Sequence, residues 1–286
     1  MEESPQINRK LGAPGPGSPR TGLRPWGGGP AFGTWESTDA PGRLLPRAFF
    51  EAAPELVAPH LLGKLLAHRS PAGLLAGRIV EVEAYLGPHN DPPDPAAHSH
   101  RGPTPRNLVL FGHAGHAYVY AIYGRYFCMN ISCETEGRAG CLLLRALEPV
   151  AGITQMAMNR GLEPNGLAPE KLARQLTSGP SRLCQALALT RLSHNGLDVA
   201  DAASALQVRD DGYKAGEVLV TPRIGIHEAV DWPLRFVLAG HHCVSGPKAM
   251  RYSETRVGVS RKHYTKVDAT IRERRPCTKL TEPQEL

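Results

Sequence analysis

Two adjoining segments constrain the fold more than any other feature of this chain. HAYVYAIYG (116–124) and RYFCMNIS (125–132) are rich in aromatic and β-branched residues, a composition typical of strands. They meet at Tyr123-Gly124-Arg125, where the glycine permits a tight turn. The pattern predicts a β-hairpin, and four of the chain's eight tyrosines fall within nine of its residues.

The other predicted elements indicate the fold class. Further strands are predicted at residues 77–86 (GRIVEVEAYL), 140–149 (GCLLLRALEP), 218–226 and 233–240. Helices are predicted at residues 52–66 and 178–189. Strands that are grouped, with helices between the groups and no regular βαβ repeat, predict a mixed α+β domain.

Composition divides the chain into three parts. Residues 1–45 are rich in Gly, Pro and Ser and lack apolar periodicity, so a disordered arm is predicted. Residues 247–286 are charged and weakly periodic, and a mostly disordered basic tail is predicted there. Residues 46–246 are the expected folded domain.

The positive charge of the chain is concentrated in this tail. The net charge is +6, but residues 46–246 carry 18 Lys and Arg against 18 Asp and Glu, whereas residues 247–286 carry ten against five. Any nucleic-acid surface on the central domain must therefore depend on a few clustered cations, because the domain as a whole is neutral.

Composition also excludes several classes of protein. No run of about 18 uncharged apolar residues is present, so a membrane span is not expected. The N-terminus begins with acidic residues and lacks an apolar segment, so secretion is not expected either. The six cysteines form no CxxC pair, which argues against a disulfide or zinc framework and is consistent with a reducing compartment.

The strand at 77–86 carries two candidate catalytic carboxylates. Side chains alternate faces along a strand, so Ile79, Glu81, Glu83 and Tyr85 share one face, opposite the valines of the core face. The two carboxylates then lie about 6.5–7 Å apart, one pleat repeat. The pattern fits a solvated strand face as well as a general base beside an aromatic platform, and the strand alone does not choose between them.

The proline-rich loop that follows this strand is a candidate pocket wall, because prolines reduce the entropy lost when a loop becomes ordered. It carries His89, His98 and His100, and a separate HxxH pair follows at His113 and His116. No second cluster of ligands accompanies these histidines at metal-binding spacing, so neither a metal nor a cofactor is expected, and a histidine that stacks or forms hydrogen bonds is favoured.

Two further features allow a structural and a functional interpretation. The tyrosine-rich hairpin fits a core hairpin, and it equally fits a wedge that enters a DNA groove with Tyr123 at its tip. The helix at 178–189 has Ser178 or Gly179 as a possible cap and Pro180 in its first turn. Its exposed backbone N–H groups beside Arg182 could bind a phosphate, or simply begin a well-capped helix.

Taken together, these segments resemble a known family. EVEAYLGP, AAHS with TPRN, YVYAIYG with YFCMN, LLRALEP, SGPSRLCQAL and RIGI occur in the order found in the alkyladenine (3-methyladenine) DNA glycosylases. The resemblance covers roughly residues 46–246. It implies one mixed domain with a curved, largely antiparallel sheet, surrounding helices and a protruding β-hairpin. It also implies an enzyme that flips alkylated or deaminated purines out of duplex DNA and hydrolyses the N-glycosidic bond with an activated water.

The same resemblance assigns roles to individual residues. Glu83 resembles the base that deprotonates the water, while Arg145 and the carbonyl of Ile224 resemble the groups that hold the water. The residues implied to surround the flipped base are Tyr85, His98, Tyr120 and Asn130. Asn130 resembles the asparagine that crowds the 2-amino group of normal guanine, and Tyr123 the side chain that fills the gap in the duplex.

Phosphate contacts are implied for Arg182 and, as a departure from the family, for Arg125. In the family, the residue beside the wedge tyrosine is usually apolar. With Arg125 at this position, we expect a contact to a DNA phosphate and a shallower insertion of the wedge into the groove. The loop before His98 is longer than usual, which leaves His100 as an alternative stacking residue. No lysine lies in these motifs, so base hydrolysis without strand cleavage is expected, from a monomer that acts in the nucleoid or the nucleus.

Two other functions remain open at this point. Glu81 and Glu83 could form the carboxylate pair of a nucleosidase or glycoside hydrolase, although carboxylates two residues apart on one strand seldom flank a bond from opposite sides. The chain could also bind damaged DNA without catalysing base release, although the presence of both Glu83 and Arg145 argues against this.

Overall fold

The structure is a computed structural model, and it describes residues 40–163 and 166–246. The arm predicted at 1–45, except its last six residues, and the tail predicted at 247–286 lie outside the described residues.

The strands are β1 (Arg43–Leu44), β2 (Leu65–Ser70), β3 (Gly73–Tyr85), β4 (Ala117–Ile122), β5 (Tyr126–Cys133), β6 (Gly140–Ala151), β7 (Leu206–Asp210), β8 (Val218–Thr221) and β9 (Arg235–Leu238). The helices are α1 (Pro54–Leu61), α2 (Ile153–Arg160), α3 (Pro169–Thr177), α4 (Pro180–Ala186) and α5 (Arg191–His194), with 3-10 turns at Arg47–Phe49 and Leu108–Phe111.

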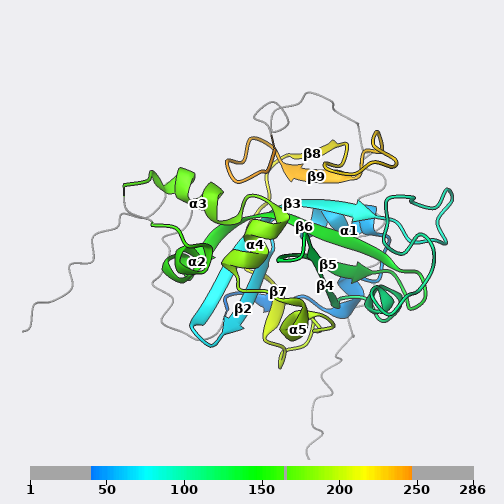
Figure 1. The fold of residues 1–286 in the computed structure, drawn as a ribbon, viewed down its shortest axis with the longest axis horizontal. Coiled ribbons are helices and arrows are strands. Elements are labelled where there is room, and N and C mark those ends of the chain that lie inside the picture. Colours follow the sequence, from blue (N-terminus) through cyan, green and yellow to red (C-terminus); the bar gives the residue numbers. More distant parts are fainter. Residues whose placement is uncertain (1–39, 164–165, 247–286) are drawn as a thin grey trace, which may run out of the picture. The chain divides into compact units, whose positions relative to one another are not determined.

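All nine described strands form one antiparallel sheet, shown in Figure 1. The strand order is β1-β7-β2-β3-β6-β5-β4, and β9 pairs with both β3 and β8. β3 is central, because it pairs with β2 at Gly73–Arg78, with β6 from Ala76 to Tyr85 and with β9 at Glu81–Glu83. The pairing of β3 with β6 shifts register on either side of Glu81, which marks a bulge. Bulges re-aim side chains, and this one lies beside both candidate carboxylates.

The helices and the sheet enclose a continuous core. α2, α3 and α4 pack on one another, with α3 and α4 also against β6 and α4 against β5, whereas α1 packs against β3 and β6 (Figure 1). β3 is consequently buried on both faces, and Ile79, Val80, Val82 and Ala84 are all fully inaccessible. The mixed α+β class that the sequence predicts is confirmed.

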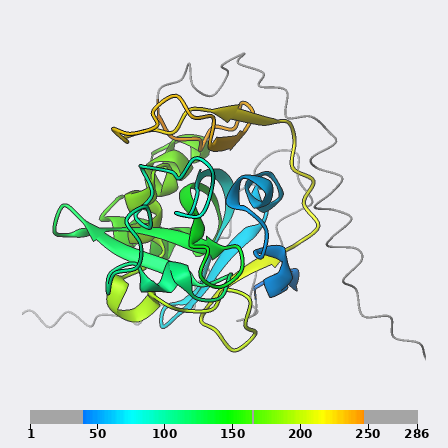
Figure 2. The same cartoon turned by 90° about the vertical axis from the view of Figure 1, so that its right-hand side faces the viewer.

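The β4–β5 hairpin agrees with the sequence prediction. Its three-residue turn is Tyr123-Gly124-Arg125, and Figure 2 shows the hairpin reaching away from the rest of the sheet. β4 is the last strand in the sheet, so only β5 pairs with it in the described residues. The tip is therefore free to contact another molecule.

The predicted start of the helix at 178–189 is also confirmed. The N-cap of α4 is Gly179 with a φ of 123°, and Pro180 occupies the first turn. Proline suits this place because the first N–H groups of a helix have no intrahelical partner. The helix ends at Ala186, three residues earlier than predicted.

Several boundaries differ from the sequence predictions, and two of the differences change which residues belong to a helix or to the folded domain. The helix predicted at 52–66 ends at Leu61, because Gly63 adopts a φ of 84° and the chain then turns into β2. The leucines at 65 and 66 share the apolar spacing of the helix but belong to a strand that is buried on both faces. At the N-terminal end, Arg43–Leu44 pair with β7, and Leu45 is buried. Ordered structure therefore begins before residue 46.

A buried histidine pair joins β2 to α5. His68 Nδ1 lies 2.8 Å from the Leu187 carbonyl, which must receive a proton from it. His194 Nδ1 accepts from the Thr190 N–H at 3.1 Å, and the two Nε2 atoms are 3.1 Å apart. Only one proton fits between the Nε2 atoms, so the pair is most stable when both rings are neutral. Burial lowers the pKa of His68 and of His194.

This pair predicts a loss of stability in acid. Each histidine has a lower pKa folded than unfolded, so the unfolded chain binds more protons as the pH falls below about 6.5. The stabilisation is complete above that pH and decreases as the pH approaches the lowered folded values. We expect the free energy of unfolding, measured by urea titration from pH 7.5 to 5, to fall less steeply in His68→Gln than in the wild type. An equal slope in both proteins would contradict the prediction, and exposed His89→Gln is the control.

No helix within residues 40–163 and 166–246 has the length and hydropathy required to cross a membrane. Five of the six cysteines lie in these ranges, and all five are buried free thiols: Cys128, Cys133, Cys141, Cys184 and Cys243.

Candidate active site

A row of side chains runs across four neighbouring strands of the sheet, from β3 to the last strand, β4. Residues that pair directly in an antiparallel sheet project to the same face. Glu83 on β3 pairs with Leu143 on β6, Leu143 pairs with Asn130 on β5, and Asn130 pairs with Tyr118 on β4. Sheet register thus brings together a carboxylate, an amide and a phenol from three separate parts of the sequence.

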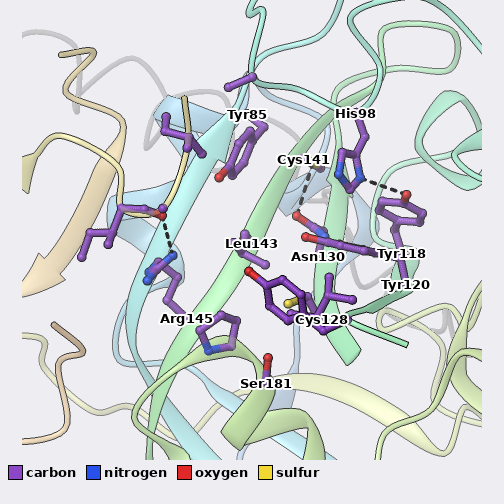
Figure 3. Close-up of a pocket in the computed structure, with 17 residues that line it drawn as sticks. Tyr85, His98, Tyr118, Tyr120, Cys128, Asn130, Cys141, Leu143, Arg145 and Ser181 are labelled. Atoms are coloured by element: carbon purple, nitrogen blue, oxygen red, sulfur yellow. Dashed lines mark hydrogen bonds between the residues drawn. The ribbon is translucent and has the colours of Figure 1, made fainter. Parts of the chain in front are cut away.

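A cavity of ≈ 410 Å³ opens over this row, and Figure 3 shows its lining. This volume is in the range of about 300–1,000 Å³ that is usual for small-ligand sites. Besides strand residues, the lining includes Ala96 and His98 from the proline-rich loop, Pro180 and Ser181 from α4, and residues 224–226 after β8. The prediction that the proline-rich loop is a pocket wall is confirmed.

Aromatic rings form one side of the cavity. Tyr118 and Tyr120 stack with centroids 5.2 Å apart, and His98 meets Tyr120 edge to face at 4.6 Å. His98 Nδ1 lies 3.1 Å from the Tyr118 hydroxyl, which fixes the imidazole (Figure 3). Desolvation and then the charge of Arg106 lower the pKa of His98, so its neutral form is favoured. Tyr118 was not among the predicted base-binding residues, although its alternation with Tyr120 was a sufficient signal.

The two candidate stacking histidines differ in their position relative to the cavity. His98 lines the cavity, whereas His100 does not. Tyr85, on the β3 edge of the cavity, lies under the guanidinium of Arg223 at 4.5 Å and donates its hydroxyl to Glu83 Oε2 at 3.1 Å. Burial and the adjacent Glu83 raise the pKa of Tyr85, so the phenol remains protonated as a donor.

Glu83 lies directly behind the cavity wall. It is fully buried, and three donors contact its carboxylate: the Ile224 N–H at 2.7 Å, Arg145 Nη1 at 3.1 Å and the Tyr85 hydroxyl. These three partners line the cavity themselves. Since an ionised carboxylate offers about four acceptor positions, one remains for a further donor.

Arg145 links Glu83 to Ile224, whose carbonyl is the third group predicted to contact the water. Its Nη1 lies 3.4 Å from the Ile224 carbonyl as well as 3.1 Å from Glu83, as Figure 3 shows for the carbonyl contact. The three residues predicted to hold a water therefore converge at one corner of the cavity. Ile224 and Arg145 border that corner, and the Glu83 carboxylate lies directly behind it.

Glu81 has a different environment from Glu83. It is fully buried, it does not line the cavity, and Arg145 Nε and Arg235 Nε contact its Oε1 at 3.0 and 2.7 Å. Desolvation opposes its charge, but the two arginines and the Ser245 N–H together lower its pKa. The interpretation of this strand face as solvated is wrong, because Glu81 and Glu83 are fully inaccessible, and the side chains of Arg235 and Ser245 contact Glu81. Glu81 is also unavailable as the second carboxylate of a glycosidase pair.

Asn130 points into the cavity beside two thiols. The Cys141 Sγ contacts Asn130 Oδ1 at 3.7 Å, and Cys128 lines the same wall. Because a carboxamide has one acceptor end, a donor at Oδ1 leaves the Asn130 NH2 group directed elsewhere. Neither cysteine was predicted as a site residue.

The predicted DNA-contacting residues lie at the cavity rim or outside it. Tyr123 is 88% exposed at the hairpin tip, with a φ of 48° that non-glycine residues rarely adopt, and it borders the cavity. Arg125 lies over the Tyr126 ring at 4.8 Å, and Arg182 donates to the Ser178 carbonyl at 3.5 Å. Neither arginine lines the cavity.

A buried ion pair, which the sequence did not reveal, fixes two walls of the cavity. Asp94 in the proline-rich loop receives both terminal nitrogens of Arg223 at 2.5 and 2.9 Å, and neither side chain is exposed. Asp94 also accepts the N–H groups of Leu86 and Ala96. Arg223 directly precedes Ile224, so this pair fastens the loop of His98 to the segment that carries the Ile224 carbonyl.

Metal-ligand geometry in the described residues is confined to a site away from the cavity. The side chains of His241, His242 and Cys243 place ligand atoms within 4.8 Å of one another. Burial and nearby acidic groups raise the pKa of the Cys243 thiol, which opposes the thiolate form that binds metals. In the HxxH motif of the sequence, His113 Nδ1 lies 3.9 Å from Glu136 Oε2.

The chain is similar in sequence to one known protein family. The sequence profile of the methylpurine-DNA glycosylase family matches residues 48–242. Three proteins named "Putative 3-methyladenine DNA glycosylase" are similar to the chain. The protein from Koribacter versatilis is 53% identical over 204 residues, 71% of this chain and 94% of the relative.

Two further relatives show a similar degree of identity. The protein from Methanoculleus marisnigri is 47% identical over 205 residues, 70% of this chain and 98% of the relative. The protein from Burkholderia lata is 43% identical over 212 residues, 74% of this chain and 95% of the relative. The matched region contains the whole cavity with its carboxylate, arginine and aromatic wall, and the chain is therefore a DNA glycosylase of the methylpurine-DNA glycosylase family.

Proposed function

We propose that this enzyme extrudes alkylated and deaminated purines from duplex DNA into the aromatic cavity and hydrolyses their N-glycosidic bond. The convergence of Glu83, Arg145 and the Ile224 carbonyl at one corner carries the proposal. A water at that corner can donate one proton to Glu83 and one to the carbonyl, while Arg145 donates to its oxygen. Its lone pair is then directed at C1′ of the extruded nucleotide.

Glu83 acts as the general base in this reaction. As the bond from C1′ to the purine breaks, positive charge develops on the sugar, and the buried carboxylate stabilises it. Water adds to C1′, its proton passes to Glu83, and the bond electrons leave with the base. None of the 17 described residues lining the cavity is a lysine, so no amine is available there to attack C1′.

The aromatic wall supports a positively charged purine as the substrate. Tyr85, His98 and Tyr120 present π faces and edges, and a purine that carries positive charge after alkylation is attracted to such faces. The neutral His98 that its surroundings favour does not repel a cationic base. Asn130 lies on the cavity floor, where it can crowd the 2-amino group of normal guanine.

A panel of single-lesion duplexes tests this proposal. Duplexes that contain one 3-methyladenine, 7-methylguanine, hypoxanthine or ethenoadenine are incubated with excess enzyme, and the released base is quantified. We expect release from at least the methylated purines, with no cleavage of the DNA strand beyond that of the abasic product, and no release from an undamaged duplex. A protein that binds these duplexes but releases no base would contradict hydrolysis and support a damage-binding role.

The hairpin tip predicts a separate effect on base extrusion. Replacing Tyr123 with alanine removes the exposed ring that would fill the gap in the duplex but retains a non-glycine residue at this φ of 48°. We expect single-turnover release to slow about tenfold, the equivalent of ~1.4 kcal/mol of lost stacking, with little change in stability. The control is Tyr213→Ala, which removes a partly exposed ring distant in sequence from the hairpin and outside the cavity. Equal rates in the two variants would exclude the wedge.

A further inference from the structure

Behind the corner of Glu83 and Arg145, a fully buried network surrounds Glu81. Its Oε1 accepts from Arg145 Nε at 3.0 Å, from Arg235 Nε at 2.7 Å and from the Ser245 hydroxyl at 2.9 Å. Its Oε2 accepts from the Ser245 N–H at 2.6 Å. Of the residues that hold these four donors only Arg145 lines the cavity, so Glu81 is poorly placed to take a proton from a water there and must serve another purpose.

The network contacts two of the three guanidinium nitrogens of Arg145, Nε and Nη2. Nε is fixed by Glu81, Nη2 lies 3.5 Å from the Ser245 hydroxyl, and only Nη1 reaches Glu83 and the Ile224 carbonyl. Because a guanidinium is planar, fixing Nε and Nη2 determines the direction of the Nη1 protons. The orientation of Arg145 at the reaction corner is therefore set from behind the cavity.

Arg235 provides the charge that makes this arrangement possible. It is fully buried, and its Nη1 and Nη2 contact the Thr221 hydroxyl at 3.0 Å and the Ser245 carbonyl at 3.2 Å. Two carboxylates, Glu81 and Glu83, face two guanidiniums, so the buried group is neutral overall. If Arg235 were absent, Arg145 alone would balance both carboxylates, and its attraction to Glu81 would compete with its contact to Glu83.

We propose that Glu81, Arg235 and Ser245 are positioning residues, which orient the Arg145 guanidinium toward Glu83 and the attacking water. The proposal rests on the hydrolytic role of Glu83 proposed above. Ser245 lies on the segment that follows β9 and contributes its N–H, hydroxyl and carbonyl. The last described residues of the chain thus act on the reaction corner without lining the cavity.

Ser245→Ala is the decisive variant, because it keeps all four charges and removes only the hydroxyl that bridges Glu81 and Arg145. In the full-length protein we expect single-turnover release of 3-methyladenine from methylated duplex DNA to fall about threefold to tenfold. That is less than the 10²–10³-fold typical of losing a directly acting donor. Affinity for a duplex with a tetrahydrofuran abasic analogue should remain unchanged, because the cavity walls are intact.

The split between rate and affinity separates positioning from a merely structural role. Arg145 reaches Glu83 and the Ile224 carbonyl through Nη1 alone, so a misdirected guanidinium impairs the reaction corner and leaves the aromatic walls of the cavity in place. A structural defect of the cavity would instead weaken binding of the abasic duplex as well. Glu81→Gln should show the same split with a larger loss of rate.

Asp211→Asn is the matched control. It breaks the two-point ion pair with Arg78, which also lies on β3 but is distant from the cavity, at 2.9 and 3.0 Å. We expect it to lower stability and leave the rate and the affinity for the abasic duplex unchanged. A wild-type rate in folded Ser245→Ala would overturn the positioning role, and this holds even if Glu81→Gln does not fold. Failure of the proposed function would appear differently, as Glu83→Gln releasing bases at the wild-type rate.

Discussion

Replacing Glu83 with glutamine is expected to abolish most base release while leaving DNA binding intact. Glutamine has the same shape, and its carbonyl oxygen can still accept from the Ile224 N–H, but it has no charge and cannot accept a proton from water. General-base contributions are typically about 10²–10⁴-fold, and we expect a loss in that range in single-turnover release of 3-methyladenine. Neutral hypoxanthine should show the greater loss, because it is a poorer leaving group than a cationic purine.

A second buried glutamate, replaced in the same way, provides the control for this measurement. Glu134 is 6% exposed and pairs with Arg138, and it does not line the cavity. Glu134→Gln should release bases at the wild-type rate. Both variants should bind a duplex with an abasic analogue as the wild type does. If Glu83→Gln matched Glu134→Gln in rate, the assignment of Glu83 as the base would be wrong.

Breaking the ion pair between Asp94 and Arg223 is expected to have the largest effect on stability. Asp94→Ala leaves the Arg223 guanidinium fully buried without its carboxylate, and the N–H groups of Leu86 and Ala96 lose their acceptor. Removing one partner of a buried pair typically costs about 3–5 kcal/mol, a large fraction of a domain's stability. Urea unfolding followed by circular dichroism measures this cost.

The same variant should also affect the reaction through geometry. Arg223 lies over Tyr85 and directly precedes Ile224, so its displacement moves one wall and one of the three groups at the reaction corner. In protein that remains folded, base release should therefore fall as well. Exposed Asp231→Ala controls for the loss of an aspartate, and equal unfolding free energies in the two variants would contradict the proposed importance of the pair.

Local elements could be predicted from the sequence where the pattern of neighbouring residues fits only one kind of structure. The hairpin around Gly124, the strand at 140–149 and the glycine–proline start of α4 depend on neighbouring residues alone, and all three form as predicted. The segment 52–66 was predicted as one helix because its leucines fit a helical spacing. In the fold, Gly63 ends that helix, and pairing with β3 and β7 makes Leu65–Ser70 a strand.

The motifs in the sequence determined the family and the identity of the residues that meet in the cavity, since each motif contributes one or two side chains of fixed chemistry. Only the tertiary structure decided how those side chains are used. Alternation placed Glu81 and Glu83 on one face, but the strand that pairs there and the serine that follows it surround Glu81, whereas the partners of Glu83 line the cavity. The reason is physical: Arg235, Ser245 and the Asp94–Arg223 pair lie far along the chain from the residues they hold, and only sheet register and burial bring them together.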